Sequence, residues 1–267
     1  MRSIVAIGIG TGNPEHLTGE ATAAMRSLDV VLVLDKGTET ADMRDLRARM
    51  LATQCAGREP RTVLVEDTKR DPELAARDYE AAVEEWHGRR VAALSAVIRE
   101  ELPEGGTAGF LVWGDPSLYD STLRMLERLR GVGAGDSPES GGGEFAVRSI
   151  AGITAPSALC AAFAIPANAI GQAIHITTGR NLPETDPGLL RNCFVMLDGG
   201  CAFRKVAEPD TEIYWGAYLG DPRQILIHGT VGEVGEEIAA ARAAARAENG
   251  WIMDTYLLRA AQPASQT

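Results

Sequence analysis

The chain has 267 residues, 45% of them hydrophobic and 24% charged, a balance typical of a globular protein with one large domain or two of ordinary size. A formal net charge of −11, without any run of more than two Lys or Arg residues, argues against nucleic acid as a partner, because binding phosphates requires a basic face. The four cysteines form no Cys-x-x-Cys pair and have no His at zinc-ligand spacing, which argues against a metal site and indicates reduced thiols.

Two further features argue against export and membrane insertion. The amino terminus lacks the long apolar segment and the small-residue cleavage site of a signal peptide. The most apolar stretch, Ala151–Ala167, is interrupted by Pro156 and Pro166 and is rich in small residues. We therefore expect a cytoplasmic protein without a membrane partner.

The first half of the chain alternates β-rich apolar runs with amphipathic segments. Strands are expected at Ser3–Ile9, Asp29–Leu34, Arg61–Glu66 and Gly109–Trp113, and helices at Gly19–Leu28 and about Asp71–Glu101. Strands that alternate with helices predict a mainly parallel sheet covered by helices on both faces.

The pattern changes after the Gly- and Ser-rich segment Gly131–Glu144, which indicates a flexible surface loop near a domain boundary. Beyond it, an Ala-rich helix is expected at Glu233–Glu248, and strands at Ala173–Thr178, Cys193–Leu197, Thr211–Tyr218, Gln224–His228 and Trp251–Leu258. Several of these strands are separated by short turns, which favours a mixed sheet with antiparallel pairs. We therefore expect an α/β protein with two α/β domains, residues 1–150 and 151–267, and an active site in the cleft between them.

A glycine-rich loop, Gly8–Thr18, follows the first expected strand. Its third glycine comes one residue too early for the dinucleotide-binding fingerprint, and no Gly-Lys-Ser/Thr is present to hold a triphosphate. Two interpretations stay open. In the first, the glycines supply the positive φ angles of a tight turn. In the second, the backbone at Gly10 and Gly12 approaches a substrate or cofactor closely.

The segment Trp113-Gly114-Asp115-Pro116 ends the fourth expected strand. Pro116 disfavours helical geometry at the residue before it, so the strand ends abruptly. Ser117 has capping-box spacing to Asp120 and is the expected N-cap of a helix at Leu118–Arg130. Ligands of parallel sheets bind outside the carboxyl ends of the strands. Asp115 is therefore expected to shape a binding edge rather than to act as a general acid.

Three motifs in order along the chain resemble the tetrapyrrole methylase family. They are Gly-x-Gly-x-Gly-x-Pro at Gly8–Pro14 followed by Leu17-Thr18, Gly-Asp-Pro at Gly114–Pro116, and GITAPSALCAAFAIP at Gly152–Pro166. Each motif is weak alone, but together they cover most of the chain. The resemblance implies the fold of that family and methyl transfer from S-adenosyl-L-methionine, with S-adenosyl-L-homocysteine as product and no metal. In this chain, Ala151 replaces the proline of the family's usual Pro-Gly-Ile-Thr.

Further segments resemble one branch of this family, including its long helical insertion before the Gly-Asp-Pro strand. They are Val33–Gly37, Arg77-Asp78-Tyr79, Trp86-His87, Val112–Arg124, His175–Leu182, Val195–Gly199, Ile213–Gly220 and Gly250–Arg259. For this branch the resemblance implies methylation of precorrin-5 at ring carbon C1 and release of its acetyl group as acetate. It also implies a homodimer.

By the same resemblance, the cofactor contacts carry over to a set of loop and strand-end residues. These are Pro14, Trp113, Gly114, Asp115, Leu118, Thr154, Ala155, Met196 and Ala217, with Gly229-Thr230 as a weaker candidate.

Loss of acetate requires a base and an oxyanion stabiliser, since water must attack the acetyl carbonyl. The catalytic candidates are Asp35, Tyr119, Asp120 and Arg180, and the candidates for substrate binding are Gly10, Gly12, Lys36, Arg124 and His175. Structural interpretations stay open for several. For Asp35, the structural interpretation is a helix cap or a partner of Lys36. For Tyr119 and Asp120, it is capping and packing in the first turn of a helix. For His175, it is a histidine buried in the core.

Three other functions stay open. The first is another tetrapyrrole C-methyltransferase, which would differ only in its substrate. The second is a nicotinamide oxidoreductase, which would explain Asp35 but does not fit the glycine spacing. The third is a binding protein without turnover, which would bind S-adenosyl-L-methionine or a tetrapyrrole and release no S-adenosyl-L-homocysteine.

Overall fold

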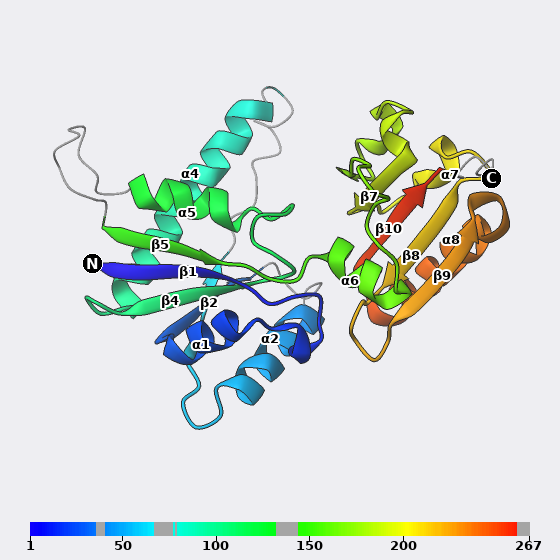
Figure 1. Cartoon of the computed structure of the whole chain (residues 1–267). Helices are drawn as coiled ribbons and strands as arrows, with labels where there is room; N and C mark the ends of the chain where they lie inside the picture. Colours follow the sequence, from blue (N-terminus) through cyan, green and yellow to red (C-terminus); the bar gives the residue numbers. More distant parts are fainter. Residues whose placement is uncertain (36–40, 67–76, 78, 132–143, 261–267) are drawn as a thin grey trace. The chain divides into compact units, whose positions relative to one another are not determined.

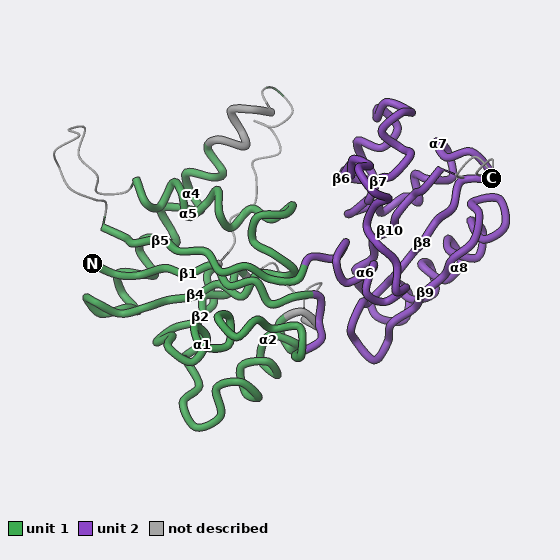
Figure 2. The backbone as a smooth tube through the Cα atoms, in the orientation of Figure 1, with its two compact units in different colours: residues 1–10, 14–153 green, residues 11–13, 154–267 purple. Residues whose placement is uncertain are grey.

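A computed structural model describes residues 1–35, 41–66, 77, 79–131 and 144–260 of the chain (Figure 1). It forms two compact units, each with its own sheet. Unit 1 comprises Met1–Gly10 and Pro14–Ile153, and unit 2 comprises Thr11–Asn13 and Thr154–Thr267 (Figure 2).

Unit 1 is a parallel sheet with helices on both faces (Figure 1). Its strands, in the spatial order β3-β2-β4-β1-β5, are β1 (Arg2–Gly8), β2 (Val30–Asp35), β3 (Arg61–Glu66), β4 (Thr107–Val112) and β5 (Phe145–Ile150). Its α-helices are α1 (Gly19–Ser27), α2 (Ala41–Gln54), α4 (Tyr79–Glu101) and α5 (Thr122–Gly131).

The two faces of this sheet have separate cores, because side chains along a strand alternate between faces. In β1, Ile4 and Ala6 pack in the core that contains α4 and α5. Val5 and Ile7 pack in the core that contains α1 and α2. The helices that follow β1 and β2 thus cover one face, and those that follow β3 and β4 cover the other.

The expected parallel sheet of unit 1 is confirmed. Two elements of this unit, strand β5 and helix α2, were not predicted. Strand β5 buries Phe145 and Ile150 but exposes most of the residues between them, as an edge strand does, so it lacks an apolar run. In helix α2, arginines and aspartates are interspersed among Ala, Met and Leu residues, which gives it a weak amphipathic pattern. The long helix expected from Asp71 is present as α4 from Tyr79, and residues 71–76 lie outside the described part.

Unit 2 has a mixed sheet, as expected (Figure 1). Its strands, in the spatial order β6-β7-β10-β8-β9, are β6 (His175–Thr178), β7 (Asn192–Met196), β8 (Glu212–Ala217), β9 (Ile225–Thr230) and β10 (Asp254–Arg259). Strands β6 and β7 are parallel, and the other neighbours are antiparallel. The α-helices are α6 (Ala155–Phe163), α7 (Phe203–Val206) and α8 (Val231–Asn249).

The core of unit 2 surrounds Trp215 and Tyr256 and includes a buried ion pair. The Nε atom of Arg242 lies 3.0 Å from Oδ2 of Asp254, and the indole N–H of Trp215 donates to the same oxygen at 3.0 Å. Burial raises the pKa of Asp254, although Arg242 and Trp215 oppose this shift. Removing either charge would leave the other one buried without compensation.

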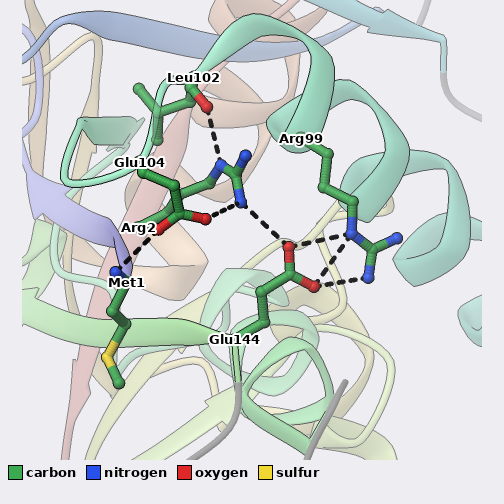
Figure 3. A network of polar contacts seen from close by, with 6 residues as sticks. All are labelled: Met1, Arg2, Arg99, Leu102, Glu104 and Glu144. Carbon is green, nitrogen blue, oxygen red and sulfur yellow. Dashed lines mark hydrogen bonds and ion pairs between the residues drawn. The ribbon is translucent and has the colours of Figure 1, made fainter.

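A polar network holds the amino-terminal edge of the unit 1 sheet together (Figure 3). Arg2, at the start of β1, donates to the Leu102 carbonyl at 2.7 Å and forms ion pairs with Glu104 at 2.8 Å and Glu144 at 3.2 Å. Glu144 also pairs with Arg99 of α4 at 2.6 Å. Glu104 and Glu144 precede β4 and β5, so the network lies at the edge opposite the loops that follow the parallel strands.

Candidate functional site

The loops after β1 and β4 join at the carboxyl edge of the unit 1 sheet. The Ile9 N–H donates to the Val112 carbonyl at 2.9 Å, which extends the strand pairing by one residue. Gly10 and Gly114 then form an antiparallel bridge, with N–H···O distances of 3.2 and 2.8 Å. The structure therefore brings the glycine loop and the Gly-Asp-Pro turn together.

Asp115 ties this turn to the end of β5. One carboxylate oxygen, Oδ1, accepts hydrogen bonds from the N–H of Ser117 at 2.8 Å and from the Ser117 hydroxyl. The other, Oδ2, accepts the Gly152 N–H at 2.8 Å. Burial opposes ionisation of Asp115, but these three hydrogen bonds together hold its pKa below the ordinary value. Asp115 is therefore ionised at neutral pH and serves as an acceptor, consistent with its expected role at a binding edge.

The turn formed by Asp115 occurs at two other Asp-Pro sequences. In each, the aspartate Oδ1 accepts the N–H two residues later, at 2.7 Å from Asp186 and at 2.9 Å from Asp221. The hydrogen bond to Gly152 distinguishes Asp115, because it reaches 37 residues along the chain. The local turn is thus encoded by the dipeptide, whereas the link between β4 and β5 depends on the tertiary structure.

Glycines are required where these loops meet. A Cβ atom on Gly152 would lie 2.1 Å from the Gly114 carbonyl oxygen, and one on Gly8 would lie 2.5 Å from the Gly152 nitrogen. Gly10, Gly12 and Gly114 have φ angles of 71°, 130° and 64°. These values support the tight-turn interpretation of the glycine loop, and they leave its role in ligand binding as a prediction.

The expected helix start after the Gly-Asp-Pro turn is wrong. Helix α5 begins at Thr122, and Ser117 donates to Asp115 rather than capping a helix. Tyr119 and Asp120 therefore precede the helix. Tyr119 is 43% exposed and has a φ angle of 52°, which is unusual for a residue other than glycine. Asp120 Oδ1 accepts the Thr122 N–H at 2.6 Å.

A small cavity of about 110 Å³ lies between the carboxyl-terminal parts of β2 and β4. Two arginines of α2, Arg44 and Arg47, line it together with Asp120. Sequence analysis missed both arginines. Their signal is their position, three residues apart in the helix that follows the second strand, which puts them on one side of that helix.

The remaining candidates of unit 1 lie around its loops. Pro14 begins a short 3-10 helix, Pro14–His16, and is exposed. Arg124 is exposed on α5. Asp35 is the last residue of β2, but its side chain and all of Lys36 lie outside the described part of the structure.

The cofactor candidates of unit 2 are mostly at element ends. Thr154 is the N-cap of α6, where its hydroxyl accepts the Ser157 N–H at 3.2 Å, and Ala155 is the first residue of that helix. Met196 ends β7 and is half-buried. Ala217, at the end of β8, has no exposed surface.

Three other candidates of unit 2 lie in or next to its edge strands. His175 is only half-buried in the edge strand β6, beside a cavity of about 400 Å³ that Arg191 and Arg259 also line, so its interpretation as a core histidine is wrong. Arg180 is exposed in the turn after β6. Thr230, following Gly229, forms a capping box with Glu233 at the start of α8.

Comparison with known proteins identifies the family. The model of the Tetrapyrrole (Corrin/Porphyrin) Methylases matches residues 3–235. The chain belongs to the tetrapyrrole methylase family. It is 44% identical over 259 residues to a precorrin-6A synthase (deacetylating) from Sinorhizobium sp., covering 97% of this chain and 95% of that protein.

Two solved structures support the fold of this tetrapyrrole methylase. The cobalamin synthesis related protein CobF from Corynebacterium diphtheriae is 44% identical, with a TM-score of 0.81 and coverage of 98% of this chain and 100% of that one. A uroporphyrin-III C-methyltransferase from Thermus thermophilus, complexed with S-adenyl homocysteine, is 16% identical, with a TM-score of 0.57 and coverage of 96% and 97%. At this low identity the second likeness concerns the fold alone.

Two features of the described residues concern metal binding and membrane insertion. No cluster of three or more His, Cys, Asp or Glu side chains within these ranges has a geometry suited to a metal ion. In the same part of the tetrapyrrole methylase, no helix is both long and apolar enough to cross a lipid bilayer.

Proposed function

We propose that this protein methylates C1 of precorrin-5 with S-adenosyl-L-methionine as donor and releases the acetyl group as acetate, which gives precorrin-6A in aerobic cobalamin biosynthesis. The observation that carries this proposal is the near full-length similarity to the precorrin-6A synthase from Sinorhizobium sp.. The glycine loop and the Gly-Asp-Pro turn support it, because they meet at the carboxyl edge of a parallel sheet, where ligands of such sheets bind.

Two buried polar atoms in the glycine loop fit a ligand with hydrogen-bonding groups. The Thr11 hydroxyl and Nδ1 of His16 have no hydrogen-bond partner among the described residues. Buried polar groups are rarely left unpaired, so a bound molecule is a suitable partner for them. The contacts that we propose for the methyl donor are those that the family resemblance implies: Pro14, Trp113–Asp115, Leu118, Thr154, Ala155, Met196 and Ala217.

Methyl transfer requires mainly alignment. The sulfonium methyl of S-adenosyl-L-methionine is an electrophile, and the reduced macrocycle is an electron-rich carbon nucleophile. The chain contributes by holding both in line, an effect that reaches several kcal/mol. The bridge between Gly10 and Gly114 and the bond between Asp115 and Gly152 make the loops at this edge rigid, which suits that task.

Loss of acetate requires a base and a donor to the developing oxyanion. The base takes a proton from water as the water oxygen bonds to the acetyl carbonyl carbon. The bond between this carbon and the ring then breaks, its electron pair passes into the conjugated ring system, and the acetyl group leaves as acetate. Asp35 and Asp120 are the candidate bases and Tyr119 is the candidate donor, whereas Arg180 is the candidate partner of a substrate carboxylate. Tyr119 is 43% exposed and has a left-handed backbone next to the Gly-Asp-Pro turn, which supports a role at this edge.

Mass spectrometry tests the proposal. The protein is incubated without oxygen with precorrin-5 and methyl-labelled S-adenosyl-L-methionine, and the macrocycle and acetate are followed together. We expect one label per macrocycle and one acetate per label. In Y119F and D120N we expect slower acetate release, whereas E127Q, which changes an exposed residue of α5, should behave as the wild type.

The other outcomes identify the alternatives. A labelled macrocycle that keeps its acetyl group would indicate a C-methyltransferase with another ring position. Binding of S-adenosyl-L-methionine without release of S-adenosyl-L-homocysteine would indicate a binding protein. The homodimer that we propose from the family is tested by light scattering of the same preparation.

A further inference from the structure

Strands β2 and β4 separate toward their carboxyl ends. Over the described residues of both strands, they pair only at Val30 and Val31 of β2, whereas β4 pairs with β1 along its whole length. A side chain of α2 occupies the space that opens between them. The Nε atom of Arg47 donates to the Leu111 carbonyl of β4 at 2.8 Å.

Among the described residues, two cationic side chains and one anionic side chain line the cavity at this opening. Arg44 and Arg47 line it from α2, Asp120 and Ser121 line it from the turn before α5, and Thr122 lines it as the first residue of α5. Two guanidinium groups with several N–H donors each therefore face the same small space. The N-terminus of α5 adds a favourable field for an anion.

The environment of Arg47 also favours an anion. Burial lowers the pKa of Arg47, and the nearby charge of Asp120 opposes this shift. Arginine stays protonated at neutral pH, so the guanidinium is a partly desolvated cation. The carboxylate of a ligand beside it would help to offset that desolvation and could bind two guanidinium N–H groups at once.

The place and size of the cavity limit what binds there. It lies between two strands whose following helices, α2 and α5, cover opposite faces of the sheet, the position at which parallel sheets bind ligands. A volume of about 110 Å³ suits a short acidic side chain but not a ring system.

We infer that this cavity binds one peripheral carboxylate of the tetrapyrrole substrate, with Arg44 and Arg47 as its donors. This inference rests on the proposed function for the identity of the substrate. It assigns to the two arginines the positioning of the macrocycle at the edge of the sheet. Arg47 also holds β4 through the Leu111 carbonyl, so Arg44 is the cleaner site for a test.

The test compares R44Q, R47Q and R44K with R49Q, an exposed arginine of the same helix. The KM for precorrin-5 is measured without oxygen, and the affinity for uroporphyrin III, an octacarboxylic tetrapyrrole, is measured by fluorescence titration. Affinity for S-adenosyl-L-homocysteine is measured by calorimetry. We expect R44Q and R47Q to weaken both tetrapyrrole readouts at least tenfold and to change S-adenosyl-L-homocysteine affinity less than twofold. R44K should recover part of the loss, and R49Q should equal the wild type.

Several results would overturn the inference. One is tetrapyrrole affinity within twofold of the wild type in R44Q. Another is a loss of S-adenosyl-L-homocysteine affinity instead, which would assign the cavity to the carboxylate of the methyl donor. A wild-type protein that binds neither tetrapyrrole would also overturn it. If the wild type binds uroporphyrin III through Arg44 but forms no methylated product, the inference stands and the proposed reaction fails.

Discussion

Replacing Asp115 by asparagine removes the carboxylate that joins the turn after β4 to the end of β5. An asparagine has one acceptor oxygen. If it keeps the Ser117 N–H, its NH₂ group faces the N–H of Gly152, and two donors then oppose each other. A hydrogen bond to a charged group contributes about 1.5–3 kcal/mol, and the exposed bonds to Ser117 contribute less. We expect D115N to lower the free energy of unfolding by about 2 kcal/mol.

The matched control is D186N. Asp186 forms the same Asp-Pro turn and accepts the Gly188 N–H at 2.7 Å, a bond that the asparagine oxygen can keep. We expect D186N to change stability by less than about 0.5 kcal/mol. Urea unfolding measures the stabilities, and hydrogen exchange of the peptide that contains Gly152 reports the lost bond directly. Faster exchange is expected in D115N alone.

The effect of D115N should also depend on pH. Because the pKa of Asp115 is lowered in the folded protein, its carboxylate stabilises the fold above the ordinary pKa of 3.8. That stabilisation is lost as the pH falls through the lowered pKa, so the difference between wild type and D115N should be full at pH 7 and shrink below pH 4. Equal stability and equal Gly152 exchange in D115N and D186N at pH 7 would refute this reasoning.

Three other substitutions or probes test the packing. R242M should destabilise the protein by about 3–5 kcal/mol in urea unfolding, because it leaves Asp254 buried without its cation; a loss of less than 1 kcal/mol would contradict this. Gly152→Ala should abolish calorimetric binding of S-adenosyl-L-homocysteine, because its Cβ would lie 2.1 Å from the Gly114 carbonyl oxygen; unchanged affinity would argue against a ligand at this edge. Burial raises the pKa of Cys193 to about 12, so its thiol should not react with Ellman's reagent at pH 8 in the native protein but should react in urea.

Strands with strong local signals were predictable from the sequence. Strands β1, β2 and β4 are covered on both faces, so their residues form continuous apolar runs such as Ser3–Ile9. The mixed sheet of unit 2 was also predictable, because short turns separate several of its strands. Strand β5 was not, because an edge strand with exposed residues has no such run.

At the candidate site, too, some features were predictable from the sequence and others were not. The glycine loop, the Gly-Asp-Pro turn and the segment Gly152–Pro166 are local motifs, and their order along the chain indicated the family. The start of α5 was mispredicted, because Ser117 had a competing partner in the carboxylate of Asp115 two residues before it.

The sequence by itself determined the buried strands, the Asp-Pro turn and the tetrapyrrole methylase family, because apolar runs and dipeptide geometry act over a few residues. Only the tertiary structure decided that Asp115 binds Gly152 and that Arg47 reaches the Leu111 carbonyl. Those contacts join residues 37 and 64 positions apart. They depend on which strands are neighbours and on where β2 and β4 separate, and no local pattern carries that information.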